Sequence, residues 1–159
     1  MTENGAFCDT SFFIRLLDKT DPLHINARNY YQYLLENNKE LYVSTIAVAE
    51  YCVGGRVDAL PIKNLKIVAF NLHHAERAGE LAQIVFRHKN KLRYKERNII
   101  PNDTKLFTQS DLEKQAGIYL SSDSESLKIY RLLNQYVALD FRFVDINTPY
   151  DQAFGVFRL

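Results

Sequence analysis

Four acidic residues stand where carboxylates could do chemistry together. Asp9, Asp103 and Asp123 each come where an apolar run gives way to a pattern typical of a helix start, and Glu50 interrupts the apolar stretch 45–53. If the strands of the fold are parallel, their carboxyl ends share one edge, where open α/β sheets place a ligand crevice. Carboxylates crowded at such an edge repel one another. A hard divalent cation such as Mg²⁺, which prefers oxygen ligands, would relieve that repulsion.

Each of the three aspartates also has a simpler interpretation as a helix N-cap. A capping side chain accepts hydrogen bonds from free backbone N–H groups and contributes about 1 kcal/mol. For Asp9, Asp103 and Asp123 taken singly, capping is the favoured interpretation. Glu50 fits it poorly, because it is expected in the middle of a helix, where an ionised carboxylate needs water or a positive partner. A solvent-facing Glu50 is the open alternative.

Strands and helices alternate along the chain, and this alternation predicts how the acids are positioned. Strands are predicted at residues 5–8, 41–43, 117–120 and 141–146, with residues 65–70 either a strand or an extended linker. Helices are predicted at residues 10–17, 21–37, 45–53, 73–88, 103–115 and 124–139. The pattern indicates one α/β domain over residues 1–159, with a central parallel sheet of four to five strands and helices on both faces. Right-handed crossovers then place all the strand ends on one rim.

Composition sets broad limits on the class of protein. The 159 residues suit one domain, and 20 Lys and Arg nearly balance 19 Asp and Glu, so net charge neither favours nor excludes a polyanionic partner. Cys8 and Cys52 lie in apolar surroundings and are expected to be buried free thiols in a reducing compartment. The N-terminus lacks the features of a signal peptide, and no apolar stretch approaches the ~18 residues of a membrane span. We therefore expect a cytoplasmic protein with no membrane association.

Other cofactor chemistries find little support in the sequence. His73 and His74 are adjacent, so on a helix their rings would point about 100° apart. No Cys and His spacing of the zinc type is present, and we predict no zinc site. Gly54 and Gly55 fall at an expected helix end and match neither the P-loop nor the dinucleotide pattern, which weakens a third hypothesis, a small-molecule or phosphate-handling α/β protein.

The ordered set of four acids resembles the PIN-domain nucleases, over about residues 7–146. In that family an acid follows the first strand in an Asp-Thr/Ser-Ser context, as Asp9 does, and a glutamate lies on the helix after the second strand, as Glu50 does. An Asn-Asp pair opens a later helix, here ending in Asp103, and a final acid follows a strand ending in Thr or Ser, here Asp123. The helix after Asp103 departs from the family, which is often rich in Ala there.

The resemblance implies a metal-dependent endoribonuclease. Asp9 and Asp103 are then the expected direct ligands of Mg²⁺ or Mn²⁺, with Glu50 and Asp123 completing the site partly through water, and one of them orienting the attacking water. Asp111, two turns from Asp103, is expected to be a surface acid. Three hydroxyl side chains are candidates for orienting the carboxylates, with simple capping as the equal alternative: Thr10, Ser11 and Ser121.

A basic stretch leads into the third acid. Residues 87–97 contain six Lys or Arg and one Tyr, which suit phosphate contacts and stacking on an unpaired base. The alternative is a solvated helix end and loop. If the stretch lies beside a nucleolytic cluster of acids, the two interpretations are about equally favoured. Arg15 is a further candidate for contacting nucleic acid, although an ion-pair or surface role is favoured.

The small size of the chain adds a further implication of the resemblance. It looks like the toxin of a bacterial or archaeal type II toxin–antitoxin pair, which would act on RNA, bind a small antitoxin whose segment covers the acidic pocket, and form a homodimer. The competing hypothesis is a non-catalytic RNA- or protein-binding module of PIN type, in which the acids are caps or a vestigial site. Dependence on Mg²⁺ or Mn²⁺ separates the two hypotheses.

Overall fold

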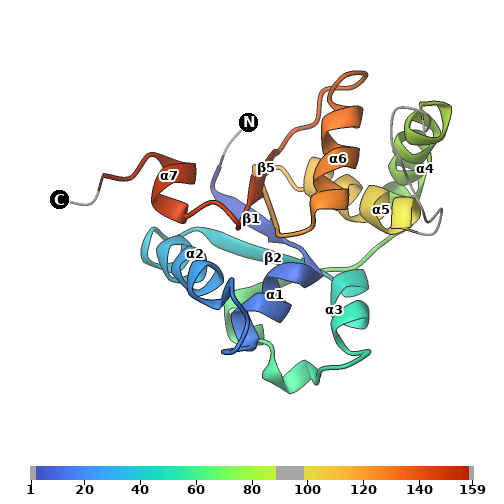
Figure 1. Ribbon diagram of the computed structural model, residues 1–159. Coiled ribbons are helices and arrows are strands. Elements are labelled where there is room, and N and C mark those ends of the chain that lie inside the picture. Colours follow the sequence, from blue (N-terminus) through green and yellow to red (C-terminus); the bar gives the residue numbers. More distant parts are fainter. Residues whose placement is uncertain (1–2, 89–98, 158–159) are drawn as a thin grey trace.

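A five-stranded parallel sheet forms the centre of the molecule (Figure 1). The computed structural model describes residues 3–88 and 99–157, with only the backbone described at 99–101. The sheet has the order β3-β2-β1-β4-β5. Its strands are β1 (Gly5–Cys8), β2 (Glu40–Ser44), β3 (Leu65–Val68), β4 (Ile118–Ser121) and β5 (Arg142–Asp145). The predicted fold class is confirmed, and the segment 65–70, for which a linker was the alternative, contains the edge strand β3.

The burial of strands β1 and β4 explains why their sequences are mostly apolar. Every residue of β1 and β4 is buried, as expected for parallel strands covered on both faces. Gly5 begins β1 where a side chain has no room, because a Cβ there would lie 2.7 Å from the carbonyl oxygen of Glu40. The edge strand β3 is only partly covered, and Ile67 is 52% exposed.

Helices cover both faces of the sheet (Figure 1). One group holds α1 (Thr10–Leu17), α2 (His24–Glu36) and α7 (Tyr150–Phe154), with α7 packed on α2. The other holds α4 (Leu72–Arg87), α5 (Ile99–Leu112) and α6 (Ser124–Leu133), which pack on one another. The short helix α3 (Thr45–Tyr51) follows β2 and contacts both α1 and α5. Two 3-10 turns, Val57–Ala59 and Ile62–Asn64, precede β3.

An aromatic cluster fixes α5 against the sheet. The Phe107 ring lies 5.0 Å from that of Tyr119 and 5.6 Å from that of Phe141, measured between centroids. Tyr130 and Phe143 extend the cluster to α6 and β5, with their centroids 5.5 Å apart. Since residues four apart share one face of a helix, Phe107 holds the face of α5 that also carries Asp103.

Several element boundaries differ from the predicted ones. Helix α2 begins at His24, because the Asp21 carboxylate accepts the N–H of Leu23 at 2.8 Å and forms a turn before the helix. Helix α6 ends at Leu133, six residues earlier than predicted, and α7 was not predicted. Helix α5 begins at Ile99, so Asp103 lies inside the helix and does not cap it.

The two cysteines have different surroundings. Cys8 is fully buried in β1, as predicted, and burial raises the pKa of its thiol, an effect to which the charge of Asp9 adds. Cys52 follows the last turn of α3 and is exposed, so the prediction that it is buried is wrong. Within residues 3–88 and 99–157, no helix has the length and apolar character that a membrane crossing requires.

Candidate active site

One cavity collects all four acids at the carboxyl ends of the strands. It has a volume of about 480 Å³ and lies between α1, α3, α5 and the connection from β4 to α6. Its walls are formed by Asp9, Thr10, Ser11, Ile14, Glu50, Asn102, Asp103, Leu106 and Asp123. The four acids are distant along the chain. Asp9 and Asp123 meet because they follow the neighbouring strands β1 and β4, whereas Glu50 and Asp103 are carried by helices α3 and α5.

Asp9 is both a helix cap and part of the cavity wall. Its Oδ1 accepts the backbone N–H of Thr10 at 2.8 Å. Its Oδ2 accepts the hydroxyls of Ser121 at 2.8 Å and Ser11 at 2.9 Å. Burial raises the pKa of the Asp9 carboxyl, the three hydrogen bonds oppose this rise, and the charge of Glu50 adds to it, with a net increase. The carboxylate is therefore held in one orientation, at the cost of being harder to ionise.

The serine hydroxyls tie the loop of one strand to the loop of the next. Ser121 Oγ accepts the N–H of Asp123 at 3.0 Å, and Ser11 Oγ accepts the N–H of Ser122 at 3.0 Å. The same two hydroxyls contact Asp9, so the connection after β4 cannot move without disturbing the acid after β1. Ser122 was not singled out from the sequence, because its contribution is a backbone N–H that any residue would provide.

Glu50 is a half-buried link between α1 and α5 rather than a solvent-facing side chain. Its Oε2 accepts the Thr10 hydroxyl at 2.6 Å, and its Oε1 accepts the side-chain amide of Asn102 at 3.0 Å. Both donors line the cavity with it. The sequence indicated Asn102 only as part of a helix start, and its contact with Glu50 depends on a separation of 52 residues.

Asp103 is the least satisfied of the four acids. It is 7% exposed, and its Oδ2 has no hydrogen-bond partner among the described residues. Burial, together with the negative charges of Asp9, Asp123 and Glu50, raises the pKa of the Asp103 carboxyl to about 8, against a lowering effect of Ser126. A buried, unpartnered carboxylate oxygen beside other carboxylates is a group that a cation would satisfy.

Asp123 is the N-cap of α6. Its Oδ1 accepts the backbone N–H groups of Glu125 at 2.8 Å and Ser126 at 3.4 Å. The capping interpretation therefore holds for Asp9 and Asp123, and both also line the cavity. Capping and a role in the site are not alternatives here, because a cap uses only one oxygen of Asp123.

The donor set of the cavity is made of oxygen atoms, as a hard cation prefers. Among residues 3–88 and 99–157, no three acidic, His or Cys side chains lie close enough together to enclose an ion as they stand. Mg²⁺ commonly keeps several water ligands and takes only one or two carboxylates from the protein. The unpartnered Oδ2 of Asp103 and the spacious cavity thus fit a partly hydrated ion better than a fully enclosed one.

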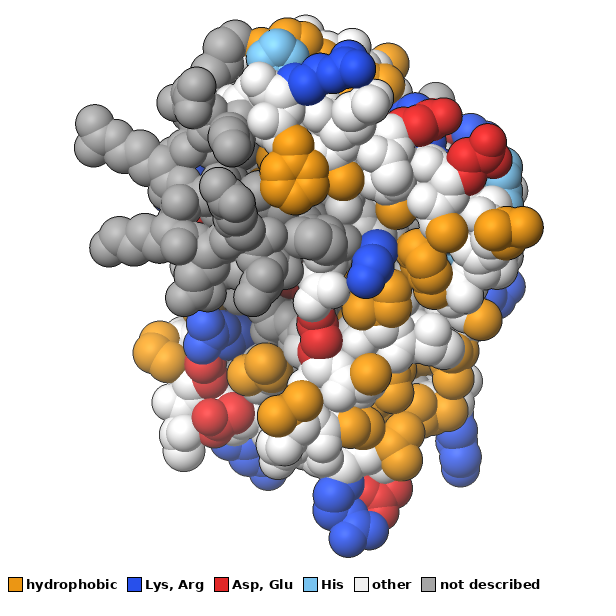
Figure 2. Space-filling view, turned by 90° about the vertical axis from the view of Figure 1, so that its right-hand side faces the viewer, with side chains coloured by type: hydrophobic (Ala, Val, Ile, Leu, Met, Phe, Trp, Pro, Cys, Tyr) orange, Lys and Arg blue, Asp and Glu red, His pale blue; other side chains and the backbone are white. Residues whose placement is uncertain are grey.

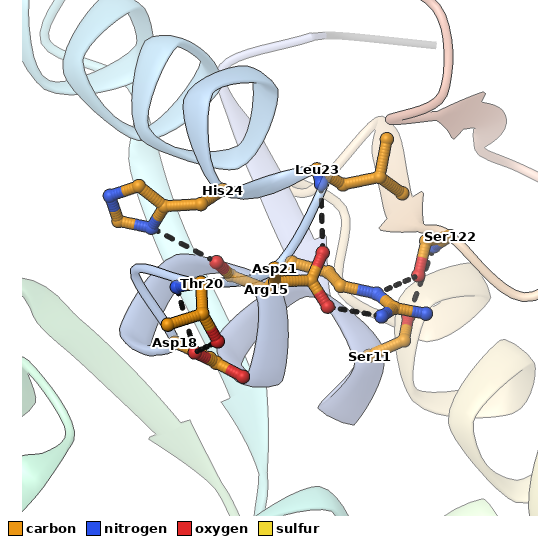
Figure 3. A network of polar contacts seen from close by, with 8 residues as sticks. All are labelled: Ser11, Arg15, Asp18, Thr20, Asp21, Leu23, His24 and Ser122. Atoms are coloured by element: carbon orange, nitrogen blue, oxygen red, sulfur yellow. Dashed lines mark hydrogen bonds and ion pairs between the residues drawn. The ribbon is translucent and has the colours of Figure 1, made fainter.

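The positively charged side chain of Arg15 lies beside this network (Figure 3). The guanidinium of Arg15 forms an ion pair with the Asp21 carboxylate and donates from Nε to the Ser122 hydroxyl at 3.4 Å. Figure 3 shows Arg15 reaching from α1 toward Asp21 on one side and Ser122 on the other. The ion-pair role favoured for Arg15 is present, and its guanidinium also contacts Ser122, whose backbone N–H donates to the Ser11 hydroxyl.

Two sequence predictions near the site fare differently. Asp111 is not a surface acid: it is 6% exposed and accepts two hydrogen bonds from Arg77, at 3.1 and 3.0 Å. The basic stretch 87–97 falls outside the described residues from position 89 onward. On the face shown in Figure 2, the described side chains mix hydrophobic, acidic and basic types and form no patch of a single charge.

The fold has relatives among solved structures, whereas no protein-family model and no curated protein matches the chain. One similar structure is a chain of VapBC2 from Rickettsia felis, in a complex with a DNA fragment from the VapBC2 promoter. It is 16% identical with a TM-score of 0.57, and the match covers 88% of this chain and 97% of that one. A chain of the DNA-bound VapBC complex from Salmonella typhimurium is 11% identical with a TM-score of 0.55, over 92% and 99%.

A third similar structure is VapC20 from Mycobacterium tuberculosis, described as a toxin that cleaves the sarcin-ricin loop. It is 16% identical with a TM-score of 0.50, over 78% of this chain and 94% of that one. At these identities the likeness concerns the fold alone. The chain therefore has the fold of the PIN-domain VapC toxins, as the order of its four acids led us to expect.

Proposed function

We propose that the chain is an endoribonuclease that depends on Mg²⁺ or Mn²⁺ and acts as the toxin of a type II toxin–antitoxin pair. The observation that carries the proposal is the single cavity lined by Asp9, Glu50, Asp103 and Asp123. Four carboxylates and no Lys or Arg line this cavity among the described residues. Such a wall repels a phosphodiester unless a cation lies between them.

The surroundings of each acid suggest its role. Asp103 would be a direct ligand through its unpartnered Oδ2, and Asp9, oriented by three hydrogen bonds, would be the other. Glu50, held by Thr10 and Asn102, and Asp123, held by the backbone of α6, would complete the site through water, one of them orienting the water that attacks. A bound ion would offset charge at the phosphate and make a water molecule more acidic.

Ion binding would be linked to loss of a proton from the site. The raised pKa of Asp103, about 8, means that this carboxyl holds a proton at neutral pH in the metal-free protein. A ligand oxygen must give up its proton to hold a cation, so metal affinity would rise with pH in this range. Ser11, Ser121 and Thr10 would keep the neighbouring carboxylates in place while Asp103 changes its charge.

The biological setting of the proposal comes from the structural relatives. Two of them are VapBC complexes and the third is described as an RNA-cleaving toxin, which supports an RNA substrate and a small antitoxin for this chain. The proposal also includes a homodimer and a place in the cytoplasm, as the resemblance of the sequence to the PIN-domain toxins implies. The antitoxin segment would cover the acid cavity and keep RNA out.

Cleavage of RNA with and without chelator tests the proposal. Wild-type protein is incubated with total RNA in Mg²⁺ or Mn²⁺, and then with EDTA, beside Asp9→Asn and the matched control Glu76→Gln. Glu76 is an exposed acid on α4 outside the cavity. We expect metal-dependent cleavage by the wild type and the control, and none by Asp9→Asn. Equal cleavage by Asp9→Asn, or cleavage that persists in EDTA, would overturn the proposal.

A non-catalytic binding module is the second candidate function. It is favoured by the capping bonds of Asp9 and Asp123, which give these two acids a structural purpose, and by the lack of three converging ligands among the described residues. The two candidates differ in their response to metal. A rise in Tm with Mg²⁺ or Mn²⁺ that disappears in Asp9→Asn favours the nuclease, and no rise favours the module.

A further inference from the structure

A second cavity adjoins the acid cavity. It has a volume of about 530 Å³ and is lined by Ile14, Leu17, Asp18, Glu50, Tyr51, Gly54 and Gly55. Its lining residues come from the end of α1, from α3 and from the turn after α3, and α1 and α3 pack against each other. Ile14 and Glu50 line both cavities, so the two cavities adjoin at these residues. A polymeric ligand with one unit in the acid cavity would reach the second cavity with its next unit.

The walls of this second cavity are apolar on two sides. Ile14 and Leu17, three residues apart, present one face of α1, and Ile14 is 46% exposed. Tyr51, the last residue of α3, also lines the cavity. A Cβ at Gly55 would lie 2.5 Å from the Tyr51 ring, so the glycine lets the backbone pack against it. A Cβ at Gly54 would meet nothing within 4 Å, so the cavity stays open there.

Two carboxylates supply the polar groups of this cavity, and no Lys, Arg or His lines it among the described residues. Asp18 Oδ1 accepts the Thr20 hydroxyl at 2.6 Å and the Thr20 N–H at 2.9 Å, as Figure 3 shows. These hydrogen bonds lower the pKa of Asp18, so its carboxylate is ionised at neutral pH. The cavity therefore excludes a phosphate and suits a flat, apolar group whose edge carries N–H donors.

We propose that this cavity is a subsite for one unpaired nucleobase, the base next to the phosphate held in the acid cavity. The base would stack on Tyr51, and its exocyclic amino group would donate to Asp18 or Glu50. Adenine, cytosine and guanine carry such an amino group, whereas uracil lacks it. The subsite would thus favour these three bases over uracil beside the cleaved bond. This inference rests on the proposed ribonuclease function.

Binding of free nucleosides tests the subsite without any need for cleavage. Adenosine and uridine carry no phosphate, and their binding to the whole protein is followed by saturation-transfer NMR. We expect a signal for adenosine at least about tenfold stronger than for uridine, retained in Tyr51→Phe and lost in Tyr51→Ala, because stacking requires the ring. Gly54→Leu should also abolish binding by filling the open side, and it leaves the packed core unchanged.

Mapping of cut sites in a random single-stranded RNA pool completes the test. Wild-type protein should disfavour uracil at one position beside the cut, and Asp18→Asn should weaken this bias. Metal-dependent cleavage with no base bias, together with equal adenosine and uridine signals, overturns the subsite and leaves the proposed function standing. Nucleoside selectivity without cleavage supports the subsite and contradicts the nuclease. Binding of free arginine in place of adenosine overturns the subsite in favour of a cationic side chain from a partner protein.

Discussion

Two aspartates on helix α5, Asp103 and Asp111, are both buried but differ in their hydrogen-bond and charge partners. Asp103 is 7% exposed and Asp111 is 6% exposed. The Asp111 carboxylate accepts two hydrogen bonds from Arg77 and a third from the N–H of Asp140 at 2.7 Å. Asp103 has no cation beside it in the described part of the chain, and its Oδ2 has no partner. Burial with partners indicates a structural role, and burial without them indicates a place prepared for something absent from the polypeptide.

The strongest test of this contrast replaces Asp103. Asp103→Asn removes a carboxyl that is ionised in the unfolded chain and must take up a proton on folding near neutral pH, so we expect the metal-free protein to become more stable by about 1–2 kcal/mol. RNA cleavage should fall by more than the roughly 10–100-fold that loss of an outer-shell partner costs. Thermal unfolding and single-turnover cleavage measure the two effects. A variant that is less stable and still active would place Asp103 in the same class as Asp111.

The opposite change in stability and activity is expected at Asp111, which is paired with Arg77. Asp111→Asn leaves the Arg77 guanidinium, whose side chain is 24% exposed, without its ion pair. We expect a loss of about 2 kcal/mol, or roughly 4–8 °C in Tm, because removing one partner strands the other. Cleavage per folded molecule should stay within about twofold of wild type. A large loss of activity in fully folded Asp111→Asn would remove the distinction between the two residues.

Dependence of stability on pH sharpens the contrast, because the pKa of Asp103 is raised. Asp103 titrates near its usual value in the unfolded chain and at about 8 in the folded one, so the folded state binds the extra proton between these values. The metal-free protein should lose stability as pH rises, by about 2 kcal/mol between about pH 5.5 and 7.5. Mg²⁺ in excess should flatten this slope. Chemical denaturation at several pH values measures it, and a flat profile without metal would contradict the assignment.

A smaller effect is expected at the hydroxyl that joins the two loops. Ser121→Ala removes one hydrogen bond to Asp9 and the acceptor of the Asp123 N–H, so we expect about 1 kcal/mol of lost stability and about tenfold slower cleavage. Ser110→Ala is the matched control, because Ser110 is equally buried and its hydroxyl has no partner in the described residues. Equal behaviour of the two variants would mean that Ser121 only fills space.

The strands could be predicted closely because their signal is local. Residues 5–8 form β1 as predicted, since an apolar run bounded by polar residues carries its own boundary. The start of α5 was placed four residues too late, because Pro101 and Asn102 are typical of a helix boundary. A proline is tolerated in the first turn, where the N–H groups have no partner within the helix.

The polar face of α5 shows where sequence reasoning ends. Its residues Thr104, Thr108, Gln109 and Ser110 are all buried, although their types are usually exposed. Asp111, which was assigned to the surface because it lies two turns from Asp103, is buried as well. Burial of a polar side chain depends on what other elements place beside it, here Arg77 of α4 and the backbone at Asp140. Neither partner is near in sequence, so no local pattern could reveal the pairing.

The position of β4 next to β1 has a consequence for the order of events during synthesis. Strand β1 leaves the ribosome well before β4, the neighbour with which it pairs on one side and which begins only at Ile118. Asp9 and Glu50 are made early, but Asp123 and the Ser121 hydroxyl are made more than a hundred residues after Asp9. A growing chain that ends before Ser121 and Asp123 lacks part of the wall of the acid cavity and one of the hydrogen bonds to Asp9. The complete site therefore forms only late in synthesis.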